Sequence, residues 1–265
     1  MGLFVKDRTL AERIVRPIMR QRQRQLFFES PNSPSLARRA IAEGVATAAL
    51  TISVVFSAQA TWLGILRPLA ICLGVPAAVA ALSLSFGPAT GAHFNPLVTG
   101  SQWLHGHRNV RCFLAYVCAQ FVGALVGAVL AALLVGPAPY VAATPIGVVV
   151  GSELFASAGL ITIVLAASLV TGPAIGLLAV VGWLVMINLV VPAAPFANPV
   201  LAVAAPLAMG TMNLSLVLAH VAAELAGAAI ALLVIAVTYP RMSVGASNGA
   251  SPLNVEAREE PVKSR

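Results

Sequence analysis

Charged residues are scarce in this chain. Asp, Glu, Lys and Arg together make up 9% of its 265 residues, whereas 59% are hydrophobic and the mean hydropathy is +0.91. Between Arg111 and Arg241 the chain carries no Lys or Arg, and its only acidic residues there are Glu153 and Glu224. Soluble domains ordinarily have about a quarter of their residues charged. The composition therefore excludes a soluble globular protein and predicts an integral membrane protein.

Cysteine is rare as well, and Cys72, Cys112 and Cys118 all lie in or beside apolar segments. Cysteine in such segments usually acts as a small hydrophobic residue, so we expect no disulfide or metal framework. The sequence also shows no nucleophile, general base or phosphate-binding loop. We therefore expect neither an enzyme nor a bound metal or cofactor. Residues 1–37 lack the apolar core of a cleavable signal peptide, so the first span is expected to act as its own signal.

Six apolar segments are long enough to cross about 30 Å of hydrocarbon. They cover roughly residues 38–60, 68–87, 111–135, 145–169, 172–192 and 213–239. Six spans place both ends of the chain on the same side of a membrane. The expected organisation is a basic tail at 1–37, a membrane domain at 38–240 and a second tail at 241–265.

Arginine and lysine are concentrated in the first 39 residues and from Arg241 onward, and only Arg67, Arg108 and Arg111 lie between these segments. Because cations favour the cytoplasmic side, both termini are predicted to lie in the cytoplasm, with the protein in the plasma (inner) membrane. The net charge of +7 is then explained by orientation and anionic lipid, and we expect no nucleic-acid partner. Residues 10–28 are predicted either to form a basic helix on the membrane surface or to have no regular structure.

Two Asn-Pro pairs, Asn95-Pro96 and Asn198-Pro199, interrupt the apolar sequence. Asn caps a helix and Pro is tolerated at the first helical position, so each pair predicts a helix start. A helix that starts within an apolar region exposes backbone that lipid cannot satisfy. Such a break must be buried in protein or line a watery cavity. The matched pair indicates two re-entrant half-helices at a pore or transport site.

The two halves of the chain resemble each other around these pairs. A Gly-Ala dipeptide follows Asn95 by 28 positions and another follows Asn198 by 29 positions. The first span of each half also carries one acid, Glu43 or Glu153. We interpret residues 38–136 and 145–240 as a duplicated unit.

Each unit has an odd number of crossings, so the second copy must be inverted relative to the first. The half-helices would then meet N-terminus to N-terminus. Their positive dipole ends would repel cations, and the carboxamides of Asn95 and Asn198 would donate hydrogen bonds to a passing neutral molecule. This arrangement favours a channel for neutral solutes.

Residues 90–99 read TGAHFNPLVT and resemble the first signature of the aquaporins, or major intrinsic proteins. Together with the second Asn-Pro pair and the repeat, the resemblance covers roughly residues 38–240. It implies an all-α membrane fold with six transmembrane helices and two half-helices, homotetramers with one pore per subunit, and passive conduction. It also implies that the pore is lined by both Asn-Pro motifs, which comprise Asn95, Pro96, Leu97, Asn198, Pro199 and Val200.

The resemblance further implies that four polar residues hold the re-entrant loops. They are Glu43, Glu153, His93 and Gln120.

The sequence departs from the family pattern around the Asn-Pro pairs. The third motif residue, usually Ala, is Leu97 in the first half and Val200 in the second. Leu201 stands where the family normally has the Arg of the selectivity filter. The remaining filter positions fall at apolar residues, which are Val75, Met186 or Ile187, and Pro195.

An apolar filter offers a permeant no compensating hydrogen bonds, which costs about 1–3 kcal/mol for each unpaired polar group. We therefore expect a permissive pore for water and small uncharged solutes rather than a strict water channel. Glycerol, urea, ammonia, hydrogen peroxide and undissociated metalloid hydroxides are all candidates. Two other functions stay open: a secondary transporter with inverted repeats, and a closed structural or junctional membrane protein.

Two further polar features each have two interpretations. Glu224 aligns internally with Gln120, and it is expected to form hydrogen bonds either within the packing surface of the sixth span or with His220 one turn earlier. His105 and His107 are interpreted either as part of a solvated cytoplasmic loop or as a pH-dependent or metal-dependent gate.

Overall fold

The computed structural model describes residues 34–60, 64, 67–136, 144–170 and 173–239. Within these residues the chain forms eight helices and no strands. The helices are α2 (Leu36–Ala58), α3 (Arg67–Thr90), α4 (Pro96–Leu104), α5 (Val110–Val135), α6 (Ile146–Val170), α7 (Pro173–Val190), α8 (Pro199–Ala208) and α9 (Leu214–Thr238). The basic segment for which a surface helix was one prediction, residues 10–28, lies outside the described residues.

Five of these helices, α2, α3, α5, α6 and α9, are long and apolar enough to cross a membrane. The remaining predicted span, the fifth along the chain, corresponds to α7, whose 18 residues rise about 27 Å, close to the hydrocarbon thickness. The predicted spans and the observed helices agree to within a few residues at most ends. The protein is an integral membrane protein.

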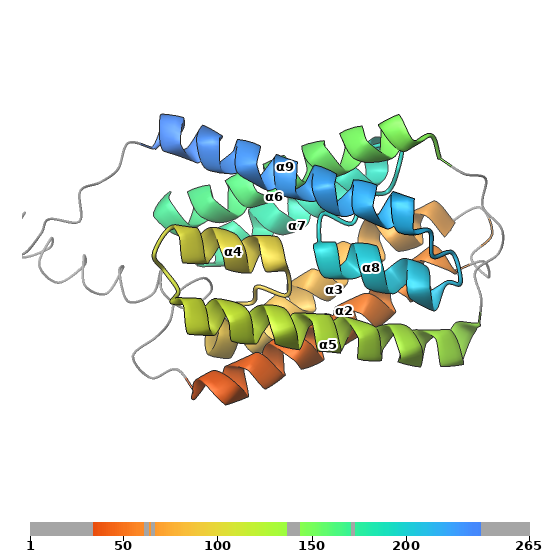
Figure 1. The fold of residues 1–265 in the computed structure, drawn as a ribbon, viewed down its shortest axis with the longest axis horizontal. Helices are drawn as coiled ribbons and strands as arrows, with labels where there is room; N and C mark the ends of the chain where they lie inside the picture. Colours follow the sequence, from red (N-terminus) through yellow and green to blue (C-terminus); the bar gives the residue numbers. More distant parts are fainter. Residues whose placement is uncertain (1–33, 61–63, 65–66, 137–143, 171–172, 240–265) are drawn as a thin grey trace, which may run out of the picture.

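The helices form two similar sets around a shared centre. Figure 1 shows α2 beside α5 and α6 beside α9, with α4 and α8 lying end to end between these pairs. Helices α3 and α7 pack against each other and complete the bundle. The packing of α2 on α5 is thus repeated by α6 on α9, as the internal repeat predicts.

Small residues allow the paired helices to approach closely. A Cβ atom on Gly123 of α5 would overlap the carbonyl oxygen of Gly44 on α2. On α9, a Cβ atom at Gly227 would lie 2.5 Å from the carbonyl oxygen of Leu154 on α6. Close contact between backbones is the usual way that helices pack in lipid, where no hydrophobic effect holds them together. These glycines therefore set the distance within each helix pair.

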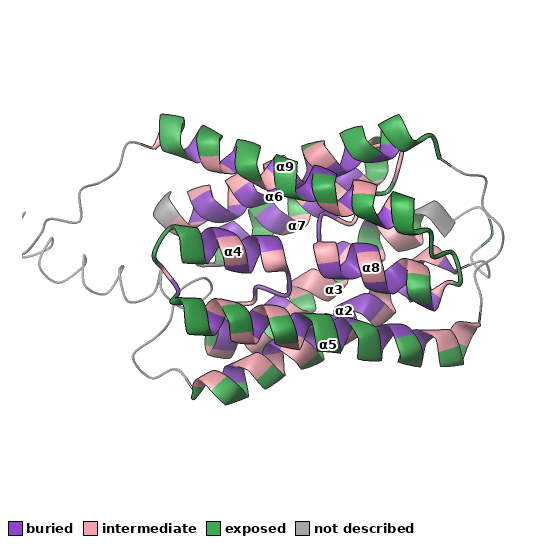
Figure 2. Ribbon diagram, in the orientation of Figure 1, coloured by how far each residue is buried: buried purple, intermediate pink, exposed green. Residues whose placement is uncertain are grey.

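Each half-helix packs into the half of the protein to which it does not belong. Leu97 and Val98 of α4 join an apolar core formed by α6, α7 and α9. Conversely, Val200 and Leu201 of α8 join the core formed by α2 and α5. The ends of α4 and α8 that face each other are buried, as Figure 2 shows. This exchange brings the two Asn-Pro pairs to the middle of the molecule.

Candidate functional site

Both half-helices begin at their Asn-Pro pair. Asn95 has an extended backbone, and its Oδ1 accepts a hydrogen bond of 2.8 Å from the backbone N–H of Leu97. Asn198 has the same extended conformation, but its side chain makes no capping hydrogen bond to α8. In both cases Pro occupies the first helical turn, where its missing N–H is not needed. The Asn-Pro pairs thus start α4 and α8 where the sequence predicts them.

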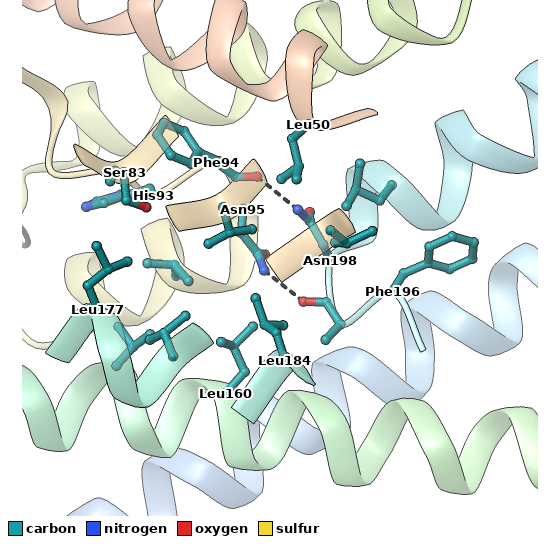
Figure 3. A pocket seen from close by; sticks show the side chains of 18 residues that line it. Leu50, Ser83, His93, Phe94, Asn95, Leu160, Leu177, Leu184, Phe196 and Asn198 are labelled. Atoms are coloured by element: carbon teal, nitrogen blue, oxygen red, sulfur yellow. Dashed lines mark hydrogen bonds between the residues drawn. The ribbon is translucent and has the colours of Figure 1, made fainter. Parts of the chain in front are cut away.

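The two carboxamides make a reciprocal exchange across the centre. Asn95 Nδ2 donates to the carbonyl oxygen of Ala197 at 2.7 Å, and Asn198 Nδ2 donates to the carbonyl oxygen of Phe94 at 2.9 Å. Figure 3 shows these two hydrogen bonds side by side between the half-helix starts. Each amino group carries a second hydrogen that remains for another acceptor. Asn198 Oδ1 is buried and has no partner among the described residues.

The residues before each Asn adopt matching strained conformations. Phe94 has φ 49° and Ala197 has φ 48°, both in the left-handed region that non-glycine residues rarely occupy. Strain of this kind costs on the order of 1–3 kcal/mol per residue and persists where surrounding contacts impose it. These are the two residues whose carbonyl oxygens accept from the opposite Asn. The strain therefore belongs to the geometry of the centre.

A buried carboxylate holds the first loop. Glu43 of α2 accepts hydrogen bonds from the backbone N–H groups of His93 at 3.0 Å and Phe94 at 2.8 Å. Gln120 of α5 donates to Glu43 at 2.9 Å and to the hydroxyl of Thr99 at 3.0 Å. Glu43 and Gln120 are both fully buried. The loop amides, which lie beyond the reach of water, are thus satisfied by side chains from two long helices.

His93 anchors the same loop on another side. Its Nδ1 lies 3.1 Å from the hydroxyl of Thr99, and its ring packs edge-on against Tyr116, with centroids 5.3 Å apart. The Tyr116 hydroxyl in turn donates to the carbonyl oxygen of Thr90 at 2.8 Å. His93 therefore contributes to the structure of the loop as well as to the wall of the cavity described below.

The second loop repeats this arrangement with additional polar groups. Glu153 of α6 accepts from the backbone N–H groups of Phe196 at 2.8 Å and Ala197 at 2.9 Å. Glu153 also contacts His220 Nδ1 of α9 at 2.6 Å. Glu224, one turn after His220, accepts from the backbone N–H of Asn198 at 2.8 Å. The second loop is thus held by two acids and a histidine.

The alternative that paired Glu224 with His220 is wrong. His220 contacts Glu153, because the two residues lie where α9 crosses α6, and this leaves Glu224 to reach the half-helix start. Glu224 is fully buried, and its second carboxyl oxygen has no partner among the described residues. Glu224 lies beside the second loop as Gln120 lies beside the first, which agrees with their internal alignment, but the alignment did not predict the partner of Glu224.

A central cavity of about 70 Å³ lies beside the two Asn side chains. Its wall consists of aliphatic side chains from α2, α3, α4, α6, α7 and α8, together with Ser83, His93 and the loop residues that flank each Asn (Figure 3). No Asp, Glu, Lys or Arg is among the described residues that line it. A water molecule needs about 10–15 Å³ of such volume, so the cavity has room for several. The site can therefore hydrate and hydrogen-bond a small neutral molecule.

A second cavity of about 130 Å³ lies next to the central one. Val75, Phe196 and Leu201 line both cavities and so form the boundary between them. All three side chains are apolar.

The sequence matches the family described as "Major intrinsic protein" over residues 30–194, which is more than half of the chain. This chain belongs to the major intrinsic protein family. Two relatives are a "Probable aquaporin AqpM" of Archaeoglobus fulgidus, 41% identical over 69 residues, and an "Aquaglyceroporin AqpS" of Rhizobium meliloti, 37% identical over 103 residues. The matched parts cover 26% and 37% of this chain, and 28% and 44% of the relatives. The match therefore spans less than half the length of either relative.

For this major intrinsic protein, the residues predicted for the selectivity filter are only partly brought together. Val75, Pro195 and Leu201 all line the second cavity. Neither Met186 nor Ile187 is among the described residues that line either cavity. Ile187 is fully buried in the apolar core, and Met186 packs against that core.

The residue of the fifth span that lines the second cavity is Asn188. The prediction counted along the family pattern and placed the filter residue of this span at Met186 or Ile187. Asn188 lies one position beyond Ile187. The apolar residues of this helix form no periodic pattern that fixes which of its residues face the cavities.

Leu97 and Val200, which replace the usual Ala of each Asn-Pro motif, point away from the two cavities. Leu97 is 5% exposed and Val200 is fully buried, and each packs into an apolar core. Neither is among the described residues that line a cavity, and Pro96 and Pro199 are not among them either. Of the six motif residues predicted to line the pore, only Asn95 and Asn198 line the central cavity. The larger side chains of Leu97 and Val200 fill space between helices.

His105 and His107 lie in the turn that follows α4. Their rings stack 6.3 Å apart, and His105 Nδ1 lies 2.9 Å from the carbonyl oxygen of Ser101. Among the described residues, no three His, Cys, Asp or Glu side chains group closely enough to hold a metal ion. Partial burial, and then the neighbouring His105 and Arg108, lower the pKa of His107 below its ordinary value. His107 is therefore neutral near pH 7.

Proposed function

We propose that this protein is a passive transmembrane channel for water and small uncharged solutes. The observation that carries the proposal is the meeting of two half-helix N-termini at a cavity whose wall is otherwise apolar. Each helix end contributes a partial positive charge of roughly half a unit, which opposes the entry of cations. The Asn95 and Asn198 amides supply donors. These groups suit neutral hydroxylic or amide solutes.

The polar residues behind the loops act as supports in this proposal. Glu43, Gln120 and His93 hold the first loop, and Glu153 holds the second. None of the acids is among the described residues that line the cavities, and their carboxylates accept from backbone amides. Coupled transport requires ionisable or ion-binding groups on the path of the substrate. Among the described residues that line the cavities, the one ionisable side chain is His93, which is held against Thr99 and Tyr116, and this favours a channel over a secondary transporter.

A closed structural protein is also less well supported. That alternative depended on the added bulk of Leu97 and Val200, and both side chains pack into the cores. The two relatives, one named as a probable aquaporin and one as an aquaglyceroporin, agree with passage of water or of glycerol-sized molecules. The proposal includes a homotetramer in the plasma membrane with both termini in the cytoplasm. Passive conduction requires no enzyme activity and no cofactor.

Leu201 makes the pore permissive in this proposal. It stands at the boundary between the cavities, is 3% exposed, and brings neither a charge nor a hydrogen-bond donor. A wall of Val75, Phe196 and Leu201 selects mainly by size, because it cannot distinguish polar groups by pairing with them. Glycerol and urea are therefore expected to pass along with water.

Stopped-flow light scattering on proteoliposomes tests the proposal. Wild-type protein should accelerate water, glycerol and urea fluxes without saturation and without dependence on an ion gradient. Leu201→Arg should narrow the solute range by adding a bulky cation at the boundary, with Leu97→Met as a control that keeps the volume of a buried side chain. A saturable, ion-dependent flux would instead indicate a transporter. No flux above that of empty liposomes would indicate a structural protein.

A further inference from the structure

The two re-entrant loops differ in one of the groups that support them. In the first loop, Gln120 Nε2 of α5 donates to the Glu43 carboxylate at 2.9 Å. Glu224 of α9 holds the corresponding place in the second copy of the repeat, beside Glu153. A carboxylate has no hydrogen to donate, whereas a carboxylic acid has one O–H donor. Only a protonated Glu224 can therefore make the hydrogen bond that Gln120 makes in the first loop.

The two carboxyl groups of the second loop accept from consecutive backbone N–H groups. Glu153 Oε2 accepts from the N–H of Ala197 at 2.9 Å, and Glu224 Oε1 accepts from the N–H of Asn198 at 2.8 Å. Glu153 and Glu224 are fully buried, and their carboxyl groups lie within hydrogen-bonding reach of each other. Two like charges this close in a site without water repel each other strongly. The pair therefore holds one proton between its oxygens.

The surrounding hydrogen bonds show which carboxyl group carries this proton. Glu153 accepts from two backbone N–H groups and contacts His220 Nδ1 at 2.6 Å, and these contacts favour a carboxylate. Glu224 accepts from a single N–H, and its Oε2 is buried without a partner among the described residues. A proton on Glu224 gives this side chain an O–H that can donate to Glu153. The proton therefore belongs to Glu224.

Few other ionisable groups surround Glu224. Helix α9 packs against α4, α6 and α8, and the one ionisable side chain on these three helices is Glu153. On α9 itself the other ionisable side chain is His220, and residues 191–198 of the second loop have none. The proton on Glu224 therefore depends on Glu153 and, through it, on His220.

We propose that the proton on Glu224 holds Asn198 in its conducting position, so that Glu224 is a positioning residue and its loss of the proton at alkaline pH lowers conduction. This inference rests on the proposed channel function. When the proton leaves, two adjacent carboxylates repel each other and Glu224 moves away from Glu153. Glu224 is bonded to the N–H of Asn198, and Asn198 Nδ2 donates to the Phe94 carbonyl oxygen across the centre. The movement therefore displaces the hydrogen bonds at the start of α8.

The test measures water and glycerol flux in proteoliposomes against pH for the wild type, Glu224→Gln and His107→Gln. Gln keeps an oxygen that accepts from Asn198 and an amino group that donates, and it has no proton to lose in this range. Wild-type flux should fall about fivefold from about pH 6 to about pH 10, which corresponds to about 1 kcal/mol for one lost hydrogen bond. The flux of Glu224→Gln should change by less than about twofold over the same range. His107→Gln removes an ionisable side chain outside the cluster and should keep the wild-type pH profile.

Infrared difference spectroscopy detects the proton directly. The wild-type spectrum minus that of Glu224→Gln, both recorded near neutral pH, should show the carbonyl stretch of a protonated carboxyl group. This band should disappear from the wild type over the same alkaline range in which its flux falls. Glu43 and Glu153 are present in both proteins, so the band in the difference belongs to Glu224.

The outcomes separate this inference from the function on which it rests. A wild-type flux that does not fall at alkaline pH, or an equal fall in Glu224→Gln, would overturn the assignment. Loss of the pH dependence in His107→Gln would overturn it too, and so would a difference spectrum without the protonated-carboxyl band. If the wild type conducts neither probe at any pH, the channel proposal itself fails, while the infrared band still tests the proton on Glu224. Should Glu224→Gln not reconstitute, Glu224→Ala removes the same carboxyl group and is judged by the same pH profile and band.

Discussion

Replacing Glu43 by Leu should destabilise the protein strongly, because this carboxylate satisfies backbone groups that water cannot reach. Glu43 is fully buried and accepts from the N–H groups of His93 and Phe94 as well as from the Gln120 amide. Leu has a similar volume, so the substitution removes acceptors without opening a large cavity. The loss therefore reports on hydrogen bonding in the loop rather than on packing.

The magnitude follows from the number of orphaned donors. A buried donor left without a partner costs about 1–3 kcal/mol, so the two loop N–H groups together cost about 2–6 kcal/mol. Gln120 keeps its hydrogen bond to Thr99, so its amide adds less. For chains of this size about 1 kcal/mol shifts a melting temperature by roughly 2–4 °C. Glu43→Leu should therefore lower the apparent melting temperature by at least about 4 °C.

To measure this shift, the tagged protein is heated in detergent, and size-exclusion chromatography then monitors its thermal unfolding. Ser53→Ala is the matched control on α2, because the Ser53 hydroxyl donates only to Ala49, a residue of its own helix. The melting temperature of Glu43→Gln should lie between those of Glu43→Leu and Ser53→Ala, because one side-chain oxygen of Gln still accepts a hydrogen bond. The reasoning would be refuted if Glu43→Leu melted together with Ser53→Ala. A folded Glu43→Leu protein with an altered pH dependence of flux would instead assign Glu43 a role in proton transfer.

Two further predictions follow from the helix crossings and from the turn after α4. Gly123→Ala should lower the melting temperature, because the added Cβ would overlap the carbonyl oxygen of Gly44. Gly147→Ala should not lower it, because nothing lies within 4 Å of the Cβ added there. Equal melting temperatures for the two variants would contradict the close packing of α2 on α5. The pKa of His107 lies below 6.5 in the folded protein, so the unfolded chain takes up this proton first and stability should fall as the pH drops below about 6.5. His107→Gln should reduce that fall, and an unchanged melting profile between pH 7 and 5 would exclude His107 as a source of it.

The fold could be predicted from the sequence because its signals are local. Apolar segments of spanning length gave the long helices, and the Asn-Pro pairs gave the starts of α4 and α8. The spacing from each Asn to its Gly-Ala dipeptide gave the repeat, and Gly123 and Gly227 do lie where the paired helices cross. Each of these inferences needs only a few neighbouring residues and the thickness of a bilayer.

The contacts at the centre could not be predicted in the same way. The partners of Glu224 and His220 depend on how α9 crosses α6, which a uniformly apolar helix does not encode in its pattern. Phe94 and Ala197 have left-handed conformations although neither residue is glycine, so the sequence gives no signal for these conformations. Asn188 was missed because the rotation of α7 depends on the path of the loop between Val190 and Asn198. A polar residue on an otherwise apolar helix was the available signal for it.

The exchange of hydrogen bonds between the two Asn residues also bears on how the chain assembles in the membrane. The first half is synthesised first, yet Asn95 Nδ2 and the Phe94 carbonyl oxygen find their partners only in the second half. Until the second half inserts, these groups are without those partners, and the strained conformation of Phe94 has less to hold it. The centre therefore closes last. Neither half can complete it alone, so the two copies of the repeat fold as one cooperative unit.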